Sequence, residues 1–318
     1  MRRILIGVAI CLFGTSAFGQ RPSDPALMLP QKALVLGYVA VAEPVRLPSG
    51  TEMGAPAAVA FDPKGHLYVL TRGSQAFLEF DPDGTFVRGF GNAFTRSHGL
   101  HIDRDGSIWA TDVGAHVVVK FSPAGQVLLT LGTRGEAGDW NESAGSRKLN
   151  QPTDVAVAAN GDVYVSQGHT PGTAGDPRVL KFDRNGRFMT SWGGKGTGPG
   201  RFDVAHGVAI DAQGMVWVMD RENQRIQIFD TNGAFVREMK YSGLPCSIDI
   251  GTEHIYMVNG YGGQVVQLDL SGKVIAAVGK PGTGLGEFGE AHSIAVSPRG
   301  ELFVADSANA ALVKFVKR

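Results

Sequence analysis

The sequence contains very little cysteine and carries no net charge, and these two features exclude several kinds of protein. The 318 residues contain two cysteines, and the 30 basic side chains equal the 30 acidic ones in number. Because Cys11 lies in a predicted export signal, Cys246 is left without a partner, and we expect no disulfide within the mature chain. A balanced charge gives no general attraction to nucleic acid or to an anionic surface, so we expect neither as a partner.

Long apolar runs are also lacking, except for one at the N-terminus. Arg2 and Arg3 precede an apolar run from Ile4 to Phe13, and small residues follow up to Gly19. This pattern is typical of a cleaved signal peptide, and the run is short for a membrane span. We therefore predict a signal at 1–19, a loose polar leader at 20–32, and a secreted or periplasmic protein. After removal of the signal, we expect a monomer that is not attached to a membrane.

Sustained helical periodicity is missing as well, and a repeated strand pattern takes its place. Each unit begins with a short apolar strand, continues through a turn such as Pro63-Lys64-Gly65, and then enters a β-rich strand such as 67–70. The first strands of the units begin about 40 to 55 residues apart, at Ala57, His98, Thr153, His206, Cys246 and His292. That spacing is typical of propeller blades of four short strands each.

Six units predict an all-β fold, a single six-bladed β-propeller over residues 33–318. The sixth unit ends at its third strand, so we expect the segment 33–47 to supply the fourth strand and close the ring. The alternative is an open β array, which we disfavour because it would leave unpaired strand edges.

Three histidines occupy the same repeat position in alternate units: His98, His206 and His292. The first strand of a blade lines the central channel, so alternate blades aim these side chains at the axis from three directions. Three imidazoles around one point suit zinc and leave a fourth position for water or substrate. A purely structural hydrogen bond is the alternative for a single histidine, but three at alternate blades favour a metal.

The loops after the second strands lie at the histidine end of the channel, because the second strand runs back toward it. Arg72 and Arg221 hold the same position in two of these loops and could clamp a carboxylate. Equally, they could be surface arginines that pair with nearby acids. We expect Asp112, Asp220 and Asp306 to brace the turns, and the insertions at 133–150, 171–177 and 193–203 to surround this mouth.

Several stretches resemble known repeats. The segment 220–230 looks like an NHL repeat, and other segments resemble the peptidylglycine α-amidating lyase domain, over roughly residues 50–318. The segments that carry this second resemblance are Ser97-His98-Gly99-Leu100, Trp109-Ala110-Thr111-Asp112-Val113, 151–157, 200–206 and Asp220-Arg221-Glu222-Asn223. That family is a six-bladed propeller that holds zinc through three histidines and cleaves a peptidyl α-hydroxyglycine into a peptide amide and glyoxylate. The resemblance implies His98, His206 and His292 as metal ligands, and Arg72 and Arg221 as the family's arginines.

The sequence departs from this family in three ways. His169 stands where the family has its catalytic tyrosine, and because histidine can accept a proton near neutral pH, we predict it as the base. Ser293 replaces an aspartate that binds calcium, and since a hydroxyl is a poorer ligand for that ion, we expect weak or no calcium binding. The family's disulfides are absent.

These observations predict a zinc-dependent lyase that cleaves a C–N bond in a small peptide-like or α-hydroxy amide substrate. Two alternatives remain open. One is a non-enzymatic NHL-repeat propeller that binds a peptide or protein partner. The other is a metal-dependent hydrolase of the lactonase type, although that chemistry usually uses carboxylate-rich calcium sites, and the ring here is rich in histidine.

Overall fold

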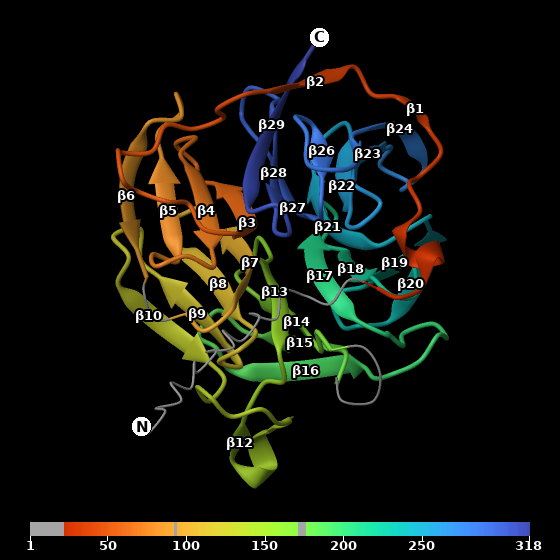
Figure 1. Cartoon of the computed structure of the whole chain (residues 1–318). Coiled ribbons are helices and arrows are strands. Elements are labelled where there is room, and N and C mark those ends of the chain that lie inside the picture. The colour runs from red at the N-terminus through yellow and green to blue at the C-terminus, as the bar shows by residue number, and fades with distance from the viewer. Residues whose placement is uncertain (1–21, 92–93, 171–175) are drawn as a thin grey trace, which may run out of the picture.

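A computed structural model of the chain describes residues 22–91, 94–170 and 176–318. It confirms the six-bladed β-propeller: six blades of four antiparallel strands surround a central channel, and one of these sheets gains a fifth, parallel strand at its outer edge (Figure 1). The first three blades are β3 (Pro56–Phe61) to β6, β7 (Ser97–Ile102) to β10, and β13 (Pro152–Val157) to β16. Their remaining strands are β4 (Leu67–Thr71), β5 (Phe77–Phe80), β6 (Phe86–Phe90), β8 (Ile108–Asp112), β9 (Val117–Phe121), β10 (Val127–Leu131), β14 (Val163–Gln167), β15 (Arg178–Phe182) and β16 (Phe188–Gly193).

The last three blades repeat this plan. Blade four is β17 (Ala205–Ile210), β18 (Val216–Asp220), β19 (Arg225–Phe229) and β20 (Phe235–Lys240). Blade five is β21 (Pro245–Ile250), β22 (Ile255–Asn259), β23 (Gln264–Leu268) and β24 (Val274–Val278). Blade six contains β27 (Ala291–Val296), β28 (Leu302–Asp306) and β29 (Ala311–Lys317), and its outermost strand is β2 (Tyr38–Val41), which pairs antiparallel with β29.

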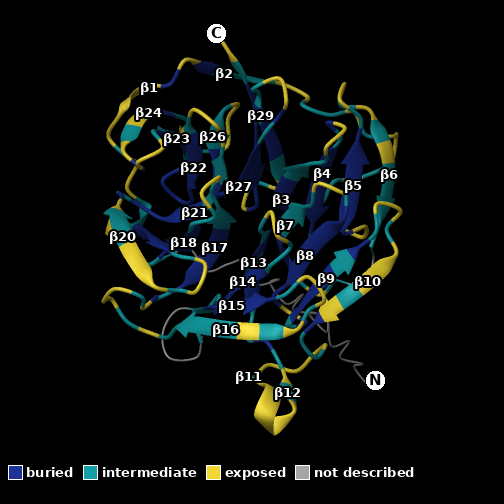
Figure 2. Ribbon diagram, turned by 180° about the vertical axis from the view of Figure 1, so that it is seen from behind, coloured by how far each residue is buried: buried dark blue, intermediate teal, exposed yellow. Residues whose placement is uncertain are grey.

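Burial follows the order of strands within each blade. The second strands are buried along their whole length in all six blades, whereas most residues of the outer strands are intermediate or exposed (Figure 2). Apolar clusters fill the spaces between neighbouring blades, such as the cluster of Tyr68, Phe77 and Val117 between blades one and two. A strand buried on both faces is rich in apolar residues, which fits the β-rich composition of second strands such as 67–70.

Basic side chains cover the aromatic residue of several second strands. Lys120, Lys181, Arg237 and Lys314 lie over the rings of Trp109, Tyr164, Trp217 and Phe303 at 5.1 to 5.5 Å. Two of these cations also reach the next blade. The Lys181 Nζ donates to the carbonyl of Thr231, and the Arg237 Nη1 donates to the carbonyl of Ser271. The four aromatic residues share one repeat position, whereas the cation comes from the third strand for Lys120, Lys181 and Lys314 and from the fourth strand for Arg237.

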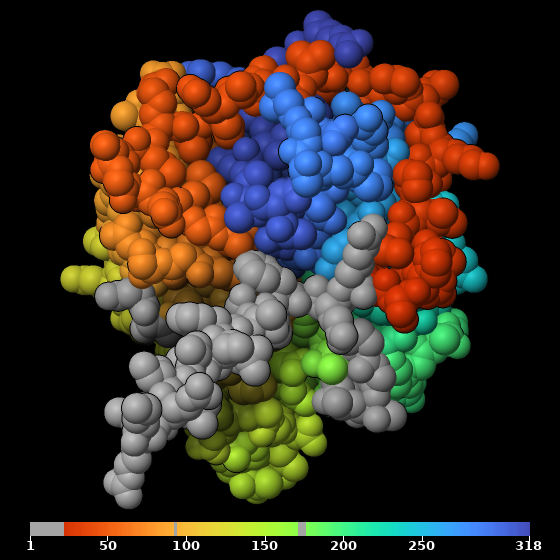
Figure 3. All heavy atoms as spheres, viewed as in Figure 1, coloured from red at the N-terminus to blue at the C-terminus, as the bar shows by residue number. Residues whose placement is uncertain are grey.

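The N-terminal segment binds along the rim instead of hanging loose. The short helix η1 (Pro25–Met28) and strand β1 (Leu34–Val35) lead into β2, and β1 pairs in parallel with β24. Gln31 exchanges hydrogen bonds with Gln264, and Arg46 bridges to Thr85 of blade one. Residues 24–46, which we call the N-terminal strap, thus touch blades four, five, six and one, and Figure 3 shows this strap in red around the edge. Residues 24–32 of the predicted leader (20–32) belong to the strap, whereas residues 20 and 21 and the predicted signal at 1–19 lie outside the described residues.

The insertion at 133–150 differs from the expectation that it surrounds the mouth. It forms the hairpin β11 (Trp140–Asn141) and β12 (Ser146–Arg147) around η2 (Glu142–Ala144), which projects from the body (Figure 1). Trp140 packs on Phe182 and Phe188, where β15 ends and β16 begins, at the end of blade three away from the histidines. An apolar anchor inside the insertion explains this position. The remaining pair, β25 (Lys280–Pro281) and β26 (Glu287–Phe288), precedes blade six.

No helix in residues 22–91, 94–170 and 176–318 is long and apolar enough to cross a membrane.

Candidate metal centre

Each inner strand carries an irregularity at its repeat position. In all six blades, the pairing of the inner strand with the second strand shifts register directly after the first residue of the inner strand. The residues that fall at this shift are Ala57, His98, Thr153, His206, Cys246 and His292. Since a β-bulge leaves one residue unpaired and turns its side chain, these bulges orient the ring of six residues.

The three histidines of this ring are held by the carbonyls of the next blade. The Nδ1 of His98 lies 2.6 Å from the Thr153 carbonyl, that of His206 lies 2.9 Å from the Cys246 carbonyl, and that of His292 lies 2.7 Å from the Ala57 carbonyl. A carbonyl can only accept, so each Nδ1 carries the proton and donates it. The lone pair of each neutral ring is therefore on Nε2.

The three rings meet on the axis. Their centroids are 4.5 Å apart for His98 and His292, 4.7 Å for His98 and His206, and 5.0 Å for His206 and His292. The Nε2 atoms of His98 and His206 are buried and have no hydrogen-bond partner in the described structure. An unpartnered buried acceptor is costly unless something binds it, so these orphaned nitrogens fit a metal ion.

His169 joins the cluster from the loop after β14. Its ring centroid lies 4.8 Å from that of His98 and 5.8 Å from that of His206. Ligand atoms of His98, His169 and His206 all lie within 4.8 Å of one another, which makes these three a possible metal-binding set. The sequence predicted His169 as a base and His292 as the third ligand, whereas the structure places both rings against the shared pair.

Burial keeps the cluster uncharged. Burial, followed by the charges of neighbouring histidines and arginines, lowers the pKa of His98, His169 and His206 well below the ordinary 6.5. Burial also lowers the pKa of His292 to about 4, although the nearby Glu290 carboxylate acts in the opposite direction. All four imidazoles are thus neutral at pH 7, the state that metal binding requires.

Charged residues surround the histidines. Arg72, predicted as part of a clamp, donates from Nε to the carbonyl of Ser97 at 3.3 Å. Arg221 is buried, and its Nε and Nη2 donate to the Glu222 Oε1 at 2.9 and 2.5 Å. Both arginines lie near His292 and influence its pKa, so the structure brings them to the cluster. Arg221 therefore pairs with a nearby acid, which was the alternative considered for these arginines.

Sequence reasoning missed two charged neighbours, Arg96 and Glu290. The Glu290 side chain is buried, and its Oε2 accepts a hydrogen bond from the Ser307 hydroxyl at 2.7 Å. Burial would raise the pKa of Glu290, but its interactions with His292 and Arg221 hold this pKa below its usual value, so the carboxyl is ionised at pH 7. Arg96 and Glu290 each stand two residues before a ring histidine, a spacing that could have revealed them.

The aspartates at the ends of the second strands brace the turns, as predicted. Asp112 and Asp306 are fully buried and accept backbone N–H bonds from the segment that precedes the ring histidine of the same blade. Asp220 accepts from the backbone of Asp203 and from Arg225. Each carboxylate thus fixes the main chain just before a histidine.

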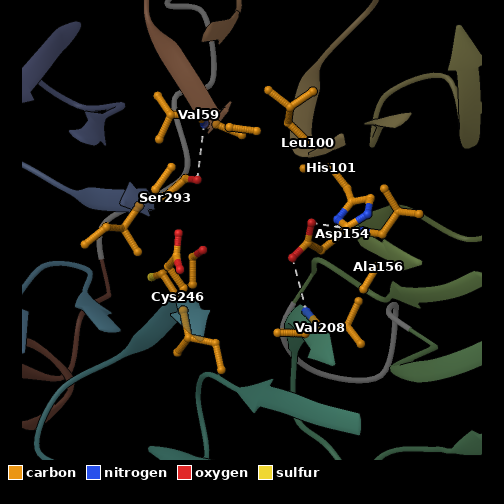
Figure 4. A pocket seen from close by; sticks show the side chains of 18 of the residues that line it. Val59, Leu100, His101, Asp154, Ala156, Val208, Cys246 and Ser293 are labelled. Carbon is orange, nitrogen blue, oxygen red and sulfur yellow. Dashed lines mark hydrogen bonds between the residues drawn. The ribbon is translucent and has the colours of Figure 1, made fainter. Parts of the chain in front are cut away.

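Behind the histidines, the channel continues as a cavity of about 350 Å³ lined by all six inner strands. Asp154 and Ser293 face each other across it (Figure 4). The carboxylate of Asp154 accepts from the backbone N–H groups of Val155 and Val208, and Ser293 Oγ accepts from that of Val59. These polar groups therefore tie the inner strands together.

Comparison with known proteins agrees with the fold and with the resemblance. A sequence model of the NHL repeat matches residues 202–229. The mouse peptidyl-glycine alpha-amidating monooxygenase is 32% identical over 307 aligned positions, which cover 82% of this chain but only 30% of the mouse protein. A probable peptidyl-alpha-hydroxyglycine alpha-amidating lyase of Caenorhabditis elegans is 28% identical, and the match covers 80% of each chain.

Among solved structures, a streptogramin B lyase superposes with a TM-score of 0.60 over 88% of this chain and 98% of that one. At 15% identity, this likeness shows the fold alone. The chain is therefore a six-bladed β-propeller that contains an NHL repeat and is similar to peptidyl-α-hydroxyglycine α-amidating lyases, as the sequence predicted.

Proposed function

We propose that this protein is a zinc-dependent lyase that converts a peptidyl α-hydroxyglycine into a peptide amide and glyoxylate. The observation that carries the proposal is the group of three imidazoles whose Nδ1 atoms are held by carbonyls and whose rings meet on the axis, with buried, unpartnered Nε2 atoms on His98 and His206. The similarity to relatives named as amidating lyases supports the reaction type.

We assign the metal to His98, His206 and His292. These three share one repeat position and one kind of second contact, a backbone carbonyl on Nδ1, which fixes the ring and leaves Nε2 free. Three histidine ligands are typical of a catalytic zinc site. When bound there, zinc would act as a Lewis acid that draws charge from a substrate oxygen.

His169 then serves as the base. In the reaction, the hydroxyl of the α-hydroxyglycine loses its proton, the carbon–oxygen double bond forms, the C–N bond breaks, and the nitrogen leaves as an amide after taking up a proton. The neutral ring of His169 faces the cluster and can accept the hydroxyl proton. His98, His206 and His292 are buried, which limits the access of water to the cluster.

Positive charge beside the cluster suits the substrate's carboxylate. Arg72 and Arg221 both lie near His292, and we propose that their field holds this carboxylate next to the histidines. Arg221 is already bonded to Glu222, which limits its freedom to bind a substrate directly.

The test is glyoxylate release from α-hydroxyhippurate by the purified, metal-loaded protein. We expect steady release that ends in the His206→Ala variant and falls strongly in His169→Ala. A loaded protein that produces no glyoxylate would contradict the lyase and favour a propeller that binds a partner without catalysis. Hydrolysis of a lactone by the same protein would instead favour the hydrolase alternative.

We also propose that residues 1–19 direct export. The test is N-terminal sequencing of the protein from a bacterial host that expresses the whole chain. The mature protein should begin near Gln20 and should occur outside the cytoplasm. An uncleaved cytoplasmic product would contradict this proposal.

A further inference from the structure

We propose that Arg96 and Arg72 together form the carboxylate subsite beside the histidines, and that Arg221 is a positioning residue. The inference rests on the proposed function and specifies how the site recognises an anionic substrate. It begins from the charges near the cluster: Arg72, Arg96 and Arg221 oppose Glu222 and Glu290. Among these residues, one positive charge stays in excess.

The charge of Arg221 is balanced by a carboxylate of the protein, Glu222. Two of its guanidinium nitrogens contact one oxygen of Glu222, and both side chains are at most 9% exposed. A substrate could bind this guanidinium only by competing with a buried ion pair, and breaking such a pair is strongly unfavourable. The geometry of Arg221 therefore suits a fixed support.

Arg96 is in the opposite situation. Its backbone is fixed, because its N–H donates to Asp112 Oδ1 at 2.8 Å and its carbonyl accepts from Val113 at 3.0 Å. Its guanidinium has no carboxylate partner in the described part of the chain. The segments outside that part, 1–21, 92–93 and 171–175, contain no Asp or Glu. Arg96 thus carries an uncompensated charge on a rigid backbone.

Arg72 brings a second guanidinium to the same place. Its Nε donates to the carbonyl of Ser97, the residue between Arg96 and His98. This contact places Arg72 against the residue that follows Arg96, and after burial the positive charge of Arg96 is the largest influence that lowers the pKa of Arg72. The charge of Arg72 lowers the pKa of His98, and that of Arg96 lowers the pKa of His169, so both charges act on the histidine cluster.

Two neighbouring cations without a bridging acid repel each other, and an anion between them relieves this repulsion. Glu290 offsets part of the charge from blade six, but its Oε2 accepts the Ser307 hydroxyl. A carboxylate has two oxygens and can accept from both guanidinium groups. The chemistry that fits is a carboxylate attached directly to the reacting carbon, as in an α-hydroxyglycine.

The test measures binding without turnover. Hippurate carries the carboxylate but lacks the α-hydroxyl, so it can bind to the metal-loaded protein without reacting, and hippuramide is its neutral counterpart. We expect calorimetry to detect hippurate, with affinity that falls as ionic strength rises, and to detect no comparable binding of hippuramide.

The variants separate the three arginines. Arg96→Ala and Arg72→Ala should each weaken hippurate binding by roughly tenfold or more, as expected for the loss of a charge-assisted hydrogen bond. Arg96→Lys should restore part of the affinity. Arg221→Ala should lower the melting temperature. The control is Arg187→Ala, at an exposed residue in the turn between β15 and β16. This variant should change neither the hippurate affinity nor the melting temperature.

Unchanged hippurate affinity in Arg96→Ala would overturn the proposal, and so would a wild-type protein that does not bind hippurate. A loss of affinity confined to Arg72→Ala and Arg221→Ala would assign the clamp to those two residues instead. Because binding is measured apart from glyoxylate release, an Arg96-dependent hippurate site in a protein without lyase activity would keep this inference while rejecting the proposed reaction.

Discussion

At the scale of single residues, the hydrogen bond that each histidine makes through Nδ1 decides which ring nitrogen is free to bind a metal. His98, His206 and His292 each donate from Nδ1 to a carbonyl, so their free nitrogen is fixed in direction before any ligand arrives. No such bond to the ring of His169 occurs in the described structure. The rings of His98, His206 and His292 are therefore held in one orientation by hydrogen bonds, whereas no such bond holds the ring of His169 in the described structure.

The first prediction separates ligand from base. The His292→Ala variant should lose stoichiometric metal, because one of three supported nitrogens is gone. His169→Ala should keep its metal while its glyoxylate release falls by roughly 100-fold or more, the usual effect of losing a general base. Metal content of both variants by mass spectrometry checks this. The reverse result, with metal lost from His169→Ala and kept in His292→Ala, would assign the site to His98, His169 and His206.

The second prediction concerns Asp154 and pH. Burial raises the pKa of this carboxyl from 3.8 to about 7 in the folded protein. The folded state therefore binds the proton more tightly than the unfolded state, and this residue's contribution to stability declines as pH rises from about 4 to about 7. Unfolding free energies measured across that range should show a slope that is reduced in Asp154→Asn. Equal slopes in both proteins would show that Asp154 titrates normally.

At the scale of elements, the decisive feature is the bulge in each inner strand. Alternation of apolar residues predicted the strands, their order and their end at each turn, since these follow from local side-chain patterns. The register shift at Ala57, His98 and their equivalents depends on pairing with the second strand, which no local pattern encodes. For the same reason, the carbonyl partners of the histidines came only from the structure.

Asp112 links this local geometry to stability. Its carboxylate accepts N–H groups from Thr95, Arg96, Gly114 and Ala115 and is fully buried. Replacing it by alanine leaves these donors unsatisfied, and we expect a loss of roughly 3 kcal/mol or more in unfolding free energy. Chemical denaturation measures the loss, with the exposed Asp139→Ala as control. A loss below about 1 kcal/mol would show that water replaces the carboxylate.

At the scale of the whole molecule, the ring depends on contacts far apart in the sequence. The repeat spacing predicted six blades and placed three histidines on one axis, because symmetry converts sequence position into spatial direction. The path of the N-terminal strap before β2 and the position of the 133–150 hairpin could not be predicted in this way. Both follow from single anchors, such as Gln31 on Gln264 and Trp140 on Phe182, that stand outside the repeat.

The strap leads to a prediction about the whole ring. A chain that begins at residue 44 lacks β2 and leaves β29 as an open edge, which exposes unpaired backbone groups. We expect a lower melting temperature and concentration-dependent aggregation, measured by calorimetry and light scattering. A chain that begins at residue 33 keeps β1 and β2 and should lose much less. Equal behaviour of the two truncated chains would show that β2 adds little to the closed ring.

The central claim is that alternate blades hold one metal ion on the propeller axis. The most direct measurement is elemental analysis of the purified protein from residue 20 onward, beside the His206→Ala variant. We predict about one zinc ion per chain in the wild type and a loss of most of it in the variant. A wild-type protein without stoichiometric metal, or a His206→Ala variant that keeps its zinc, would contradict the account.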